Sequence, residues 1–216
     1  MKYVLFDLDG TIIDTLEGLK NAVNHALTHY NHPLRTLNEI RLFVGNGVQK
    51  LLERSFPKGT SKEELSDGFN LFKDYYAEHF IDQSKPYKGM LEMLNRLKQN
   101  YKLAVVSNKN DPFAKQLVEH YFPGVFTVIQ GTYNDKPKKP DPYIVNKCLE
   151  QLGAKKEECL FIGDTPVDVQ TAINSSLRRV VVTYGFRSKE ELLQVVPNED
   201  FVDTINELEK KIMLIH

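Results

Sequence analysis

The sequence predicts an α/β fold built on a doubly wound parallel sheet, and three observations support this prediction. Short apolar runs alternate with segments whose apolar residues recur every three or four positions, as expected for parallel strands joined by crossover helices. Residues 15–84 interrupt this alternation with helical patterns alone. Polar residues, many of them acidic, directly follow several apolar runs, at the strand ends where parallel sheets bind ligands.

The expected strands and helices follow one another along the chain. Short, β-rich apolar runs predict strands over residues 3–6, 102–107, 126–130, 159–163 and 179–184. Helical spacing of apolar residues predicts helices over residues 91–101, 111–121, 141–152 and 166–176. The C-terminal segment, residues 188–216, is expected to add a last strand near Phe201 and Val202, followed by a helix.

The helical segment that interrupts the alternation is too long for a crossover connection. Its apolar spacing predicts helices over residues 16–31, 36–43, 47–56 and 61–82. We therefore expect two domains, a core of residues 1–14 and 85–216 and a helical cap of residues 15–84. A cap anchored beside the first acidic cluster is well placed to exclude water and to contact a substrate.

Composition and charge exclude several classes of partner. The 28 basic and 29 acidic residues leave a net charge of −1, which gives no large field for binding nucleic acid or an anionic membrane. The apolar runs are far shorter than the roughly 20 residues that span a bilayer, and the N-terminus lacks the apolar stretch of a signal peptide. We expect a cytoplasmic protein, a monomer or homodimer, that acts on a small molecule.

Polar clusters follow the strands at positions that a parallel sheet would bring to one edge. Asp7 and Asp9 come directly after the first strand, residues 107–109 after the second, and residues 163–168 after the fourth. A lysine-rich loop, residues 136–142, opens the helix that precedes the fourth strand. Because the carboxyl ends of parallel strands meet at one edge, these clusters are expected to converge.

The chemistry of these clusters points to phosphoryl transfer. Residues two apart in a strand face the same side, so Asp7 and Asp9 would repel each other without a cation between them. Carboxylates without histidine or thiol ligands favour a hard cation, and Mg²⁺ is the natural choice. A cation, a lysine and a hydroxyl together neutralise a phosphoryl group, and a free carboxylate can attack its phosphorus atom.

Four separated motifs resemble those of the haloacid dehalogenase-like hydrolases, and the resemblance covers essentially the whole chain. They are DLDGT (7–11), VVSNK (105–109), KKPDP (138–142) and GDTPVD (163–168), in the order that the family shows. The resemblance implies a Rossmann-like core with a small helical cap between the first and second motifs. It further implies a Mg²⁺-dependent reaction through an aspartyl-phosphate intermediate.

The resemblance implies roles for the acids of the motifs. Asp7 would be the nucleophile and a ligand of the metal, and Asp164 would bind the metal directly. Asp9 would protonate the leaving oxygen and then activate water, while its backbone carbonyl binds the metal. Asp168 would hold the metal's waters or position the catalytic lysine. From the residues alone, Asp168 is also interpretable as a first-turn acid of helix 166–176, favoured by the helix dipole.

The remaining roles fall on hydroxyl, amide and amine groups. Thr11 would support the phosphate-binding loop, while Ser107 and the backbone amide of Asn108 would bind phosphoryl oxygens. The catalytic lysine would be Lys139, because it directly precedes a Pro-x-Pro stretch and proline fixes an extended backbone before it. Its neighbours Lys136 and Lys138 remain alternatives.

Within the family, the sequence is similar to the phosphoglycolate phosphatases. Asp9 argues against the dehalogenases, which lack the second acid, whereas residues 43–47 and 183–186 resemble phosphatase segments. Two glycines in residues 43–47 would let the backbone approach a small anion, although a simple helix–helix turn also explains them. Arg35 and Arg41 are further candidates for binding an anionic substrate. The alternatives are a β-phosphoglucomutase-like sugar-phosphate mutase, a pyrophosphatase or 5′-nucleotidase, and a non-catalytic phospholigand sensor.

Overall fold

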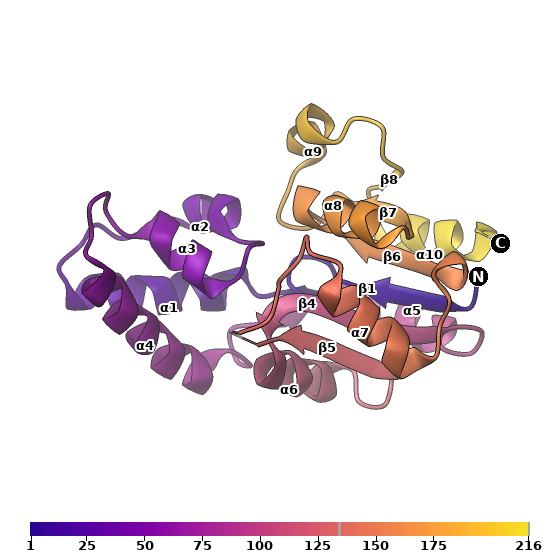
Figure 1. Cartoon of the computed structure of the whole chain (residues 1–216), viewed down its shortest axis with the longest axis horizontal. Helices are drawn as coiled ribbons and strands as arrows, with labels where there is room; N and C mark the ends of the chain where they lie inside the picture. Colours follow the sequence, from indigo (N-terminus) through magenta and orange to yellow (C-terminus); the bar gives the residue numbers. More distant parts are fainter. Residues whose placement is uncertain (134, 216) are drawn as a thin grey trace.

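A six-stranded parallel sheet forms the centre of the computed structural model, which describes residues 1–133 and 135–215 (Figure 1). The spatial order of the strands is β5-β4-β1-β6-β7-β8, and every neighbouring pair is parallel. Their bounds are Tyr3–Phe6 (β1), Lys102–Asn110 (β4), Val128–Thr132 (β5), Cys159–Gly163 (β6), Arg178–Val182 (β7) and Phe201–Val202 (β8). The predicted α/β fold class is therefore confirmed.

Helices cover both faces of the sheet because successive residues of the central strand point in opposite directions. Val4 and Phe6 face helices α5, α6 and α10, whereas Tyr3 and Leu5 face helices α7 and α8. Burial on both faces explains why the strands read as continuous apolar runs. The bounds of these helices are Met90–Leu97 (α5), Asp111–Tyr121 (α6), Tyr143–Leu152 (α7), Pro166–Ser175 (α8) and Ile205–Leu214 (α10).

The inserted segment folds as four helices, which lie to the left of the sheet in Figure 1. Two of them begin with side-chain caps: Thr36 and Glu39 form a capping box, and Ser61 accepts a hydrogen bond from the Glu64 amide. Buried side chains such as Leu27 and Phe72 join the helices to each other and to the core. Their bounds are Leu16–His29 (α1), Leu37–Phe43 (α2), Val48–Ser55 (α3) and Lys62–His79 (α4).

The chain leaves the sheet region and returns to it through two short paired strands. Strand β2 (Ile13–Asp14) pairs antiparallel with β3 (Lys85–Pro86), with Ile13 opposite Pro86. The pairing brings the two connections side by side, so the chain enters and leaves the helical insertion at one place. The division into a core of residues 1–14 and 85–216 and a cap of residues 15–84 stays a prediction.

Besides small shifts at element ends and the unpredicted short strands β2 and β3, the structure differs from the predicted elements in two places. Strand β4 continues to Asn110, three residues beyond the predicted end, because Asn110 pairs with Thr132 after an irregularity in the register. A further helix, α9 (Lys189–Val195), was not predicted and begins at a capping box formed by Ser188 and Glu191. Within the described residues, no helix combines the length and apolarity needed to cross a bilayer.

Candidate active site

Asp7 lies at the carboxyl end of β1, immediately after the strand's last residue, with only 7% of its surface exposed. Its backbone amide still donates to the carbonyl of Ile162 in β6, at 2.8 Å, which fixes the direction of the side chain. The carboxylate Oδ1 lies 2.8 Å from Nζ of Lys139. That contact is an ion pair outside hydrogen-bonding geometry, so this buried oxygen accepts no hydrogen bond from the described residues.

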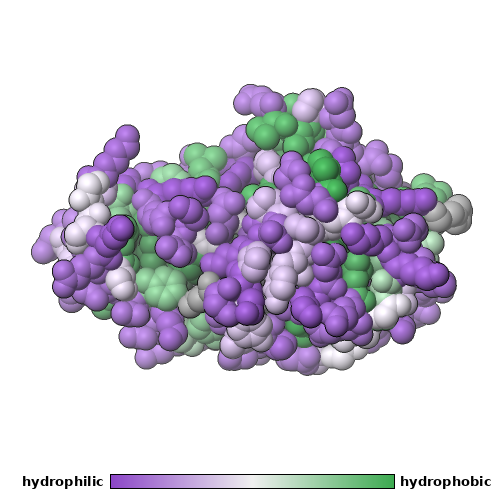
Figure 2. Space-filling view, viewed as in Figure 1, coloured by the Kyte–Doolittle hydropathy of each residue, from purple (hydrophilic) through white to green (hydrophobic). Residues whose placement is uncertain are grey.

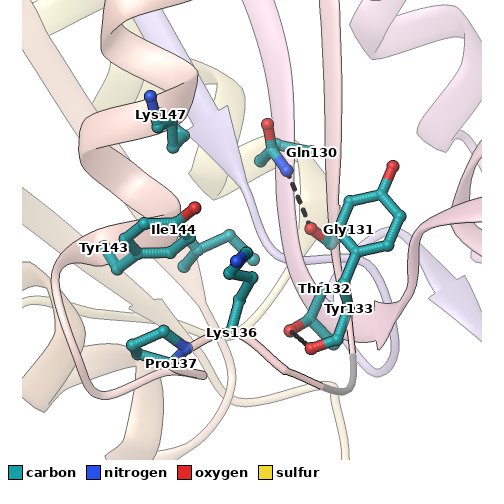
Figure 3. A pocket seen from close by; sticks show the side chains of 9 residues that line it. All are labelled: Gln130, Gly131, Thr132, Tyr133, Lys136, Pro137, Tyr143, Ile144 and Lys147. Carbon is teal, nitrogen blue, oxygen red and sulfur yellow. Dashed lines mark hydrogen bonds between the residues drawn. The ribbon is translucent and has the colours of Figure 1, made fainter.

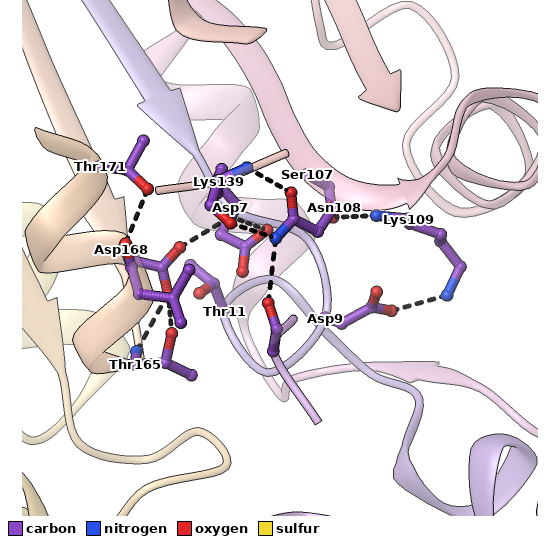
Figure 4. Close-up of polar contacts among 12 residues, drawn as sticks. Asp7, Asp9, Thr11, Ser107, Asn108, Lys109, Lys139, Thr165, Asp168 and Thr171 are labelled. Atoms are coloured by element: carbon purple, nitrogen blue, oxygen red, sulfur yellow. Dashed lines mark hydrogen bonds and ion pairs between the residues drawn. The ribbon is translucent and has the colours of Figure 1, made fainter. Parts of the chain in front are cut away.

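Lys139 is the lysine that the fold brings to Asp7, and it lies in the loop before helix α7 (Figure 4). Its ammonium group also donates to Oδ1 of Asp168 at 2.7 Å, and its side chain is 1% exposed. The side chain of Asn108 holds the Lys139 backbone from both sides, accepting from its amide at 2.7 Å and donating to its carbonyl at 3.0 Å. The loop is thereby fastened to the end of β4.

Asp164 completes a group of three buried carboxylates. Oxygen atoms of Asp7, Asp164 and Asp168 lie within 4.8 Å of one another, and among the described residues they form the one acidic group able to hold a metal ion. Thr11 donates to Oδ1 of Asp164 at 2.9 Å, and the Phe186 amide donates to Oδ2 at 2.7 Å. These contacts fix the orientation of the Asp164 carboxylate.

Gly10 is required for this close approach between the first motif and Asp164. Its φ is +86°, a conformation that favours glycine, and a Cβ atom there would lie 2.3 Å from Oδ2 of Asp164. Any side chain at this position would therefore displace the Asp164 carboxylate.

Burial makes it costly in free energy for Asp7, Asp164 and Asp168 all to be ionised unless a further cation is present. Burial raises the pKa of Asp7 to about 7, against the opposing effect of Lys139. The pKa of Asp164 is raised well above its usual value by burial and by the negative charges of Asp168 and Asp7. Burial alone would lower the pKa of Lys139, but Asp168 and Asp7 outweigh it and raise that pKa. One lysine thus balances only part of the negative charge.

Asp168 combines the two interpretations that the sequence left open. Its Oδ2 accepts hydrogen bonds from the amide and hydroxyl of Thr165, at 3.0 and 2.6 Å, so it caps helix α8. Its Oδ1 binds the ammonium group of Lys139. Capping the helix fixes the carboxylate that in turn fixes the lysine.

Asp9 is oriented differently from the other acids of the motifs. Its Oδ1 accepts a hydrogen bond from Nζ of Lys109, at 2.9 Å (Figure 4). The same oxygen accepts a hydrogen bond from the hydroxyl of Thr15, at 2.7 Å. Its side chain lies outside the group formed by Asp7, Asp164 and Asp168. Lys109 belongs to the second motif, and the sequence predicts no role for it. Its contact with Asp9 becomes visible only in the tertiary structure.

Ser107 and Asn108 belong to the buried part of β4, near its carboxyl end, and lie next to Lys139 in Figure 4. Ser107 is 2% exposed, and its hydroxyl accepts a hydrogen bond from the Lys109 amide at 3.2 Å. The side chain of Asn108 additionally donates to the carbonyl of Gly45 at 3.1 Å. The glycine-containing cap segment therefore touches the core beside the candidate site.

The two cap arginines considered as anion ligands are engaged within the protein. Arg35 donates to the carbonyl of Ser55 at 2.7 Å and to Glu39 at 3.0 Å. Arg41 pairs with both carboxylate oxygens of Glu191, at 2.6 and 2.9 Å, and this hydrogen bonding lowers the pKa of Glu191 to about 2. Arg41 thus fastens the cap to helix α9.

A separate surface pocket of about 240 Å³ lies beside helix α7 (Figure 3). Lys136 and Pro137 line it, together with Tyr143 and the end of β5. Of the site residues considered from the sequence, only the alternative lysine, Lys136, lines this pocket. The predicted residues gather instead at the carboxyl ends of β1, β4 and β6.

This fold and this site define a capped α/β hydrolase with a Rossmann-like core. The sequence model of the haloacid dehalogenase-like hydrolases matches residues 4–182. The chain belongs to that family.

Relatives with known names and structures place the chain among the phosphatases of the family. It is 31% identical to a phosphoglycolate phosphatase of Vibrio parahaemolyticus over 96% of this chain and 94% of the relative. It is 32% identical to one of Aquifex aeolicus, with 86% of each chain covered. A predicted phosphatase of Clostridium acetobutylicum shares the fold with a TM-score of 0.88 and 30% identity, over 99% of both chains.

The raised pKa values predict how the metal-free protein responds to pH. Because the pKa of Asp7 is about 7 in the folded state and about 3.9 in a free chain, the folded protein binds more protons between these values. Its stability therefore falls as pH rises through this window. In chelator, Asp164→Asn should reduce the fall in melting temperature between pH 5 and pH 8, since one buried negative charge is removed. Exposed Asp67 provides the control, because Asp67→Asn should follow the wild type; equal slopes for all three proteins would contradict the prediction.

Proposed function

We propose that this chain is a Mg²⁺-dependent phosphatase that hydrolyses a small phosphate monoester through an aspartyl-phosphate formed on Asp7. The observation that carries the proposal is the ion pair of buried Asp7 with Lys139, within reach of Asp164 and Asp168. A carboxylate nucleophile must approach a negatively charged phosphoryl group, so fixed positive charge beside it lowers the barrier.

The donor set fits Mg²⁺. Three buried carboxylates lie within 4.8 Å of one another, and one buried oxygen of Asp7 accepts no hydrogen bond from the described residues. Asp7, Asp164 and the backbone carbonyl of Asp9 would hold the ion, which is the set predicted from the sequence. When bound, Mg²⁺ supplies positive charge to a phosphoryl oxygen and to the nucleophile.

The side chains divide the reaction into two steps. In the first, a carboxylate oxygen of Asp7 bonds to phosphorus while the bond to the leaving oxygen breaks, and Asp9 gives that oxygen a proton. In the second, Asp9 takes a proton from water as the water oxygen attacks phosphorus, which releases phosphate and restores Asp7. Lys139 neutralises the transferring group in both steps, and Ser107 with the Asn108 amide would bind its oxygens.

The substrate we propose is phosphoglycolate or a closely similar small phosphorylated acid. Two of the relatives described above are phosphoglycolate phosphatases and align over most of this chain. The cap supports a small substrate, because Gly45 contacts Asn108 directly. Gly47 of the cap also faces the lysine loop of the core, because a Cβ atom there would lie 3.4 Å from Nζ of Lys138.

Phosphate release from a panel of phosphomonoesters tests this proposal. We expect the highest kcat/KM for phosphoglycolate, activity that requires Mg²⁺, and loss of activity in chelator. Sugar phosphates, nucleoside monophosphates and pyrophosphate serve as comparison substrates. Transfer of phosphate between sugar hydroxyls would instead identify a mutase. Absence of metal-dependent release from every member of the panel would refute a catalytic function.

Lys139 provides a sharper test of the site, because the same loop contains a second lysine. Lys139→Met should lower kcat by about 10²- to 10³-fold, since a preorganised charge that stabilises the transition state is lost. It should also destabilise the protein by about 3–5 kcal/mol, because two buried carboxylates lose their partner. Steady-state kinetics and urea denaturation measure the two effects.

The matched control is Lys136→Met, which alters an exposed lysine paired with Asp135. This variant should retain wild-type activity and stability within about 0.5 kcal/mol. A larger loss of activity in Lys136→Met than in Lys139→Met would reverse the assignment of the catalytic lysine.

A further inference from the structure

Lys109 is a buried cation with a single acidic partner, and the proposed chemistry gives it no task. It belongs to strand β4 and is 8% exposed. Its ammonium group lies 2.9 Å from Oδ1 of Asp9. Burial alone would lower the pKa of Lys109, but Asp9 and Tyr76 outweigh burial and raise it, so the side chain stays charged. A buried charge is costly unless it is paired, so this contact fixes both side chains.

The two contacts of Asp9 leave one of its oxygens available. Lys109 and the hydroxyl of Thr15 both donate to Oδ1, and Oδ2 accepts no hydrogen bond from the described residues. The Asp9 side chain is 21% exposed, compared with 10% for Asp7. A carboxylate held at one oxygen and open at the other is oriented to exchange a proton through the open oxygen.

The cap reaches this pair through Tyr76 of helix α4. The ammonium group of Lys109 lies 5.0 Å from the centre of the Tyr76 ring, a cation–π contact. Tyr76 is 2% exposed, and its ring packs against Phe72, Phe80 and Phe113. Its hydroxyl has no hydrogen-bond partner among the described residues, so the ring face makes the contact with Lys109, and the packing of the ring holds it in place.

We infer that Lys109 is a positioning residue that holds Asp9 for proton transfer to the leaving oxygen, with Tyr76 of the cap fixing Lys109. The inference rests on the proposed function, because it assigns Lys109 a task only if Asp9 is the proton donor. In that step a carboxylate oxygen of Asp7 bonds to phosphorus as the bond between phosphorus and the leaving oxygen breaks, and the proton on Asp9 moves to that oxygen. The phosphoryl group is thereby transferred to Asp7, and the leaving group departs as an alcohol.

Leaving-group chemistry separates positioning of the acid from a general structural role. An alkyl leaving group such as the glycolate alkoxide needs a proton as the bond breaks. The 4-nitrophenolate ion is a stable anion and leaves without one. The value of kcat/KM reports the steps up to release of the leaving group and excludes the later hydrolysis of the aspartyl-phosphate, in which Asp9 serves both substrates alike. A variant that only misplaces Asp9 should therefore lose kcat/KM on the alkyl phosphate and retain far more of it on the aryl phosphate.

The experiment compares kcat/KM of purified variants on phosphoglycolate and 4-nitrophenyl phosphate with Mg²⁺. We expect Lys109→Met to lower kcat/KM for phosphoglycolate by about 10²-fold, the effect of a misplaced catalytic group, with a loss at least about tenfold smaller on the aryl phosphate. Lys109→Arg should recover part of the loss, because it keeps the charge. Tyr76→Leu should reproduce the selective loss in weaker form.

Two comparisons test whether the loss in Lys109→Met is specific and acts through Asp9. Lys102→Met alters another lysine of β4, which lies 6.0 Å from the centre of the Tyr3 ring, and both substrates should be turned over at wild-type rates. Asp9→Asn should show the same substrate selectivity as Lys109→Met, and the double variant should show no further loss. If Lys109→Met does not fold, as judged by thermal denaturation, Tyr76→Leu and Lys109→Arg carry the same comparison.

The outcomes separate the inference from the proposed function. Selective loss in Asp9→Asn with equal losses on both substrates in Lys109→Met would overturn the role of Lys109 alone. Equal losses of kcat/KM on both substrates in Asp9→Asn would overturn the proton-donor role of Asp9, and the inference with it. Additive losses in the double variant would likewise contradict positioning, because they would show that Lys109 acts independently of Asp9.

Discussion

The ion pairs of Lys139 with Asp7 and Asp168 are the interaction on which the rest of the site depends. Burying a carboxylate costs free energy unless a cation or hydrogen-bond donors compensate it. Lys139 compensates two carboxylates at once, at 2.8 and 2.7 Å. Asp164 lies in the same group with no lysine of its own, and burial raises its pKa and that of Asp7. The remaining negative charge suits a bound cation and an electrophilic phosphoryl group.

Parallel topology explains how distant residues reach one small volume. Strands β1, β4 and β6 are neighbours at the centre of the sheet, so the polar residues after each of them meet at one edge. Hydrogen bonds across these ends then fix the side chains: Thr11 holds Asp164, and Asn108 holds the backbone of Lys139. The same Asn108 side chain contacts Gly45 of the helical insertion, so the insertion is joined to the site by the group that orders the lysine loop.

Much of this arrangement was predictable from the sequence because strand ends and motif order determine which residues converge. The fold class and the family are confirmed, and Lys139 lies against Asp7 as its place before a Pro-x-Pro stretch predicted. The catalytic and metal-binding roles of the residues stay predictions, as do the domain bounds, the cytoplasmic location and the oligomeric state.

Sequence patterns could not predict which side chains contact one another in the folded protein. The direction of the Asp9 carboxylate depends on Thr15 and Lys109, and that of Arg41 depends on Glu191, which lies 150 residues away in the chain. Asp168 has both of the roles that the sequence left open, since Oδ2 caps helix α8 and Oδ1 binds Lys139. Such assignments require the tertiary structure because a side-chain rotamer responds to neighbours from several elements.

The central claim is that Asp7 is the nucleophile that accepts the phosphoryl group from the substrate and then transfers it to water. Acid quenching of the enzyme during turnover of phosphoglycolate, followed by peptide mapping with mass spectrometry, tests this directly. The account predicts an acid-stable, hydroxylamine-sensitive phosphoryl group on the peptide containing Asp7, and none in Asp7→Asn. A phosphoryl group on a different residue, or full turnover by Asp7→Asn, would contradict it.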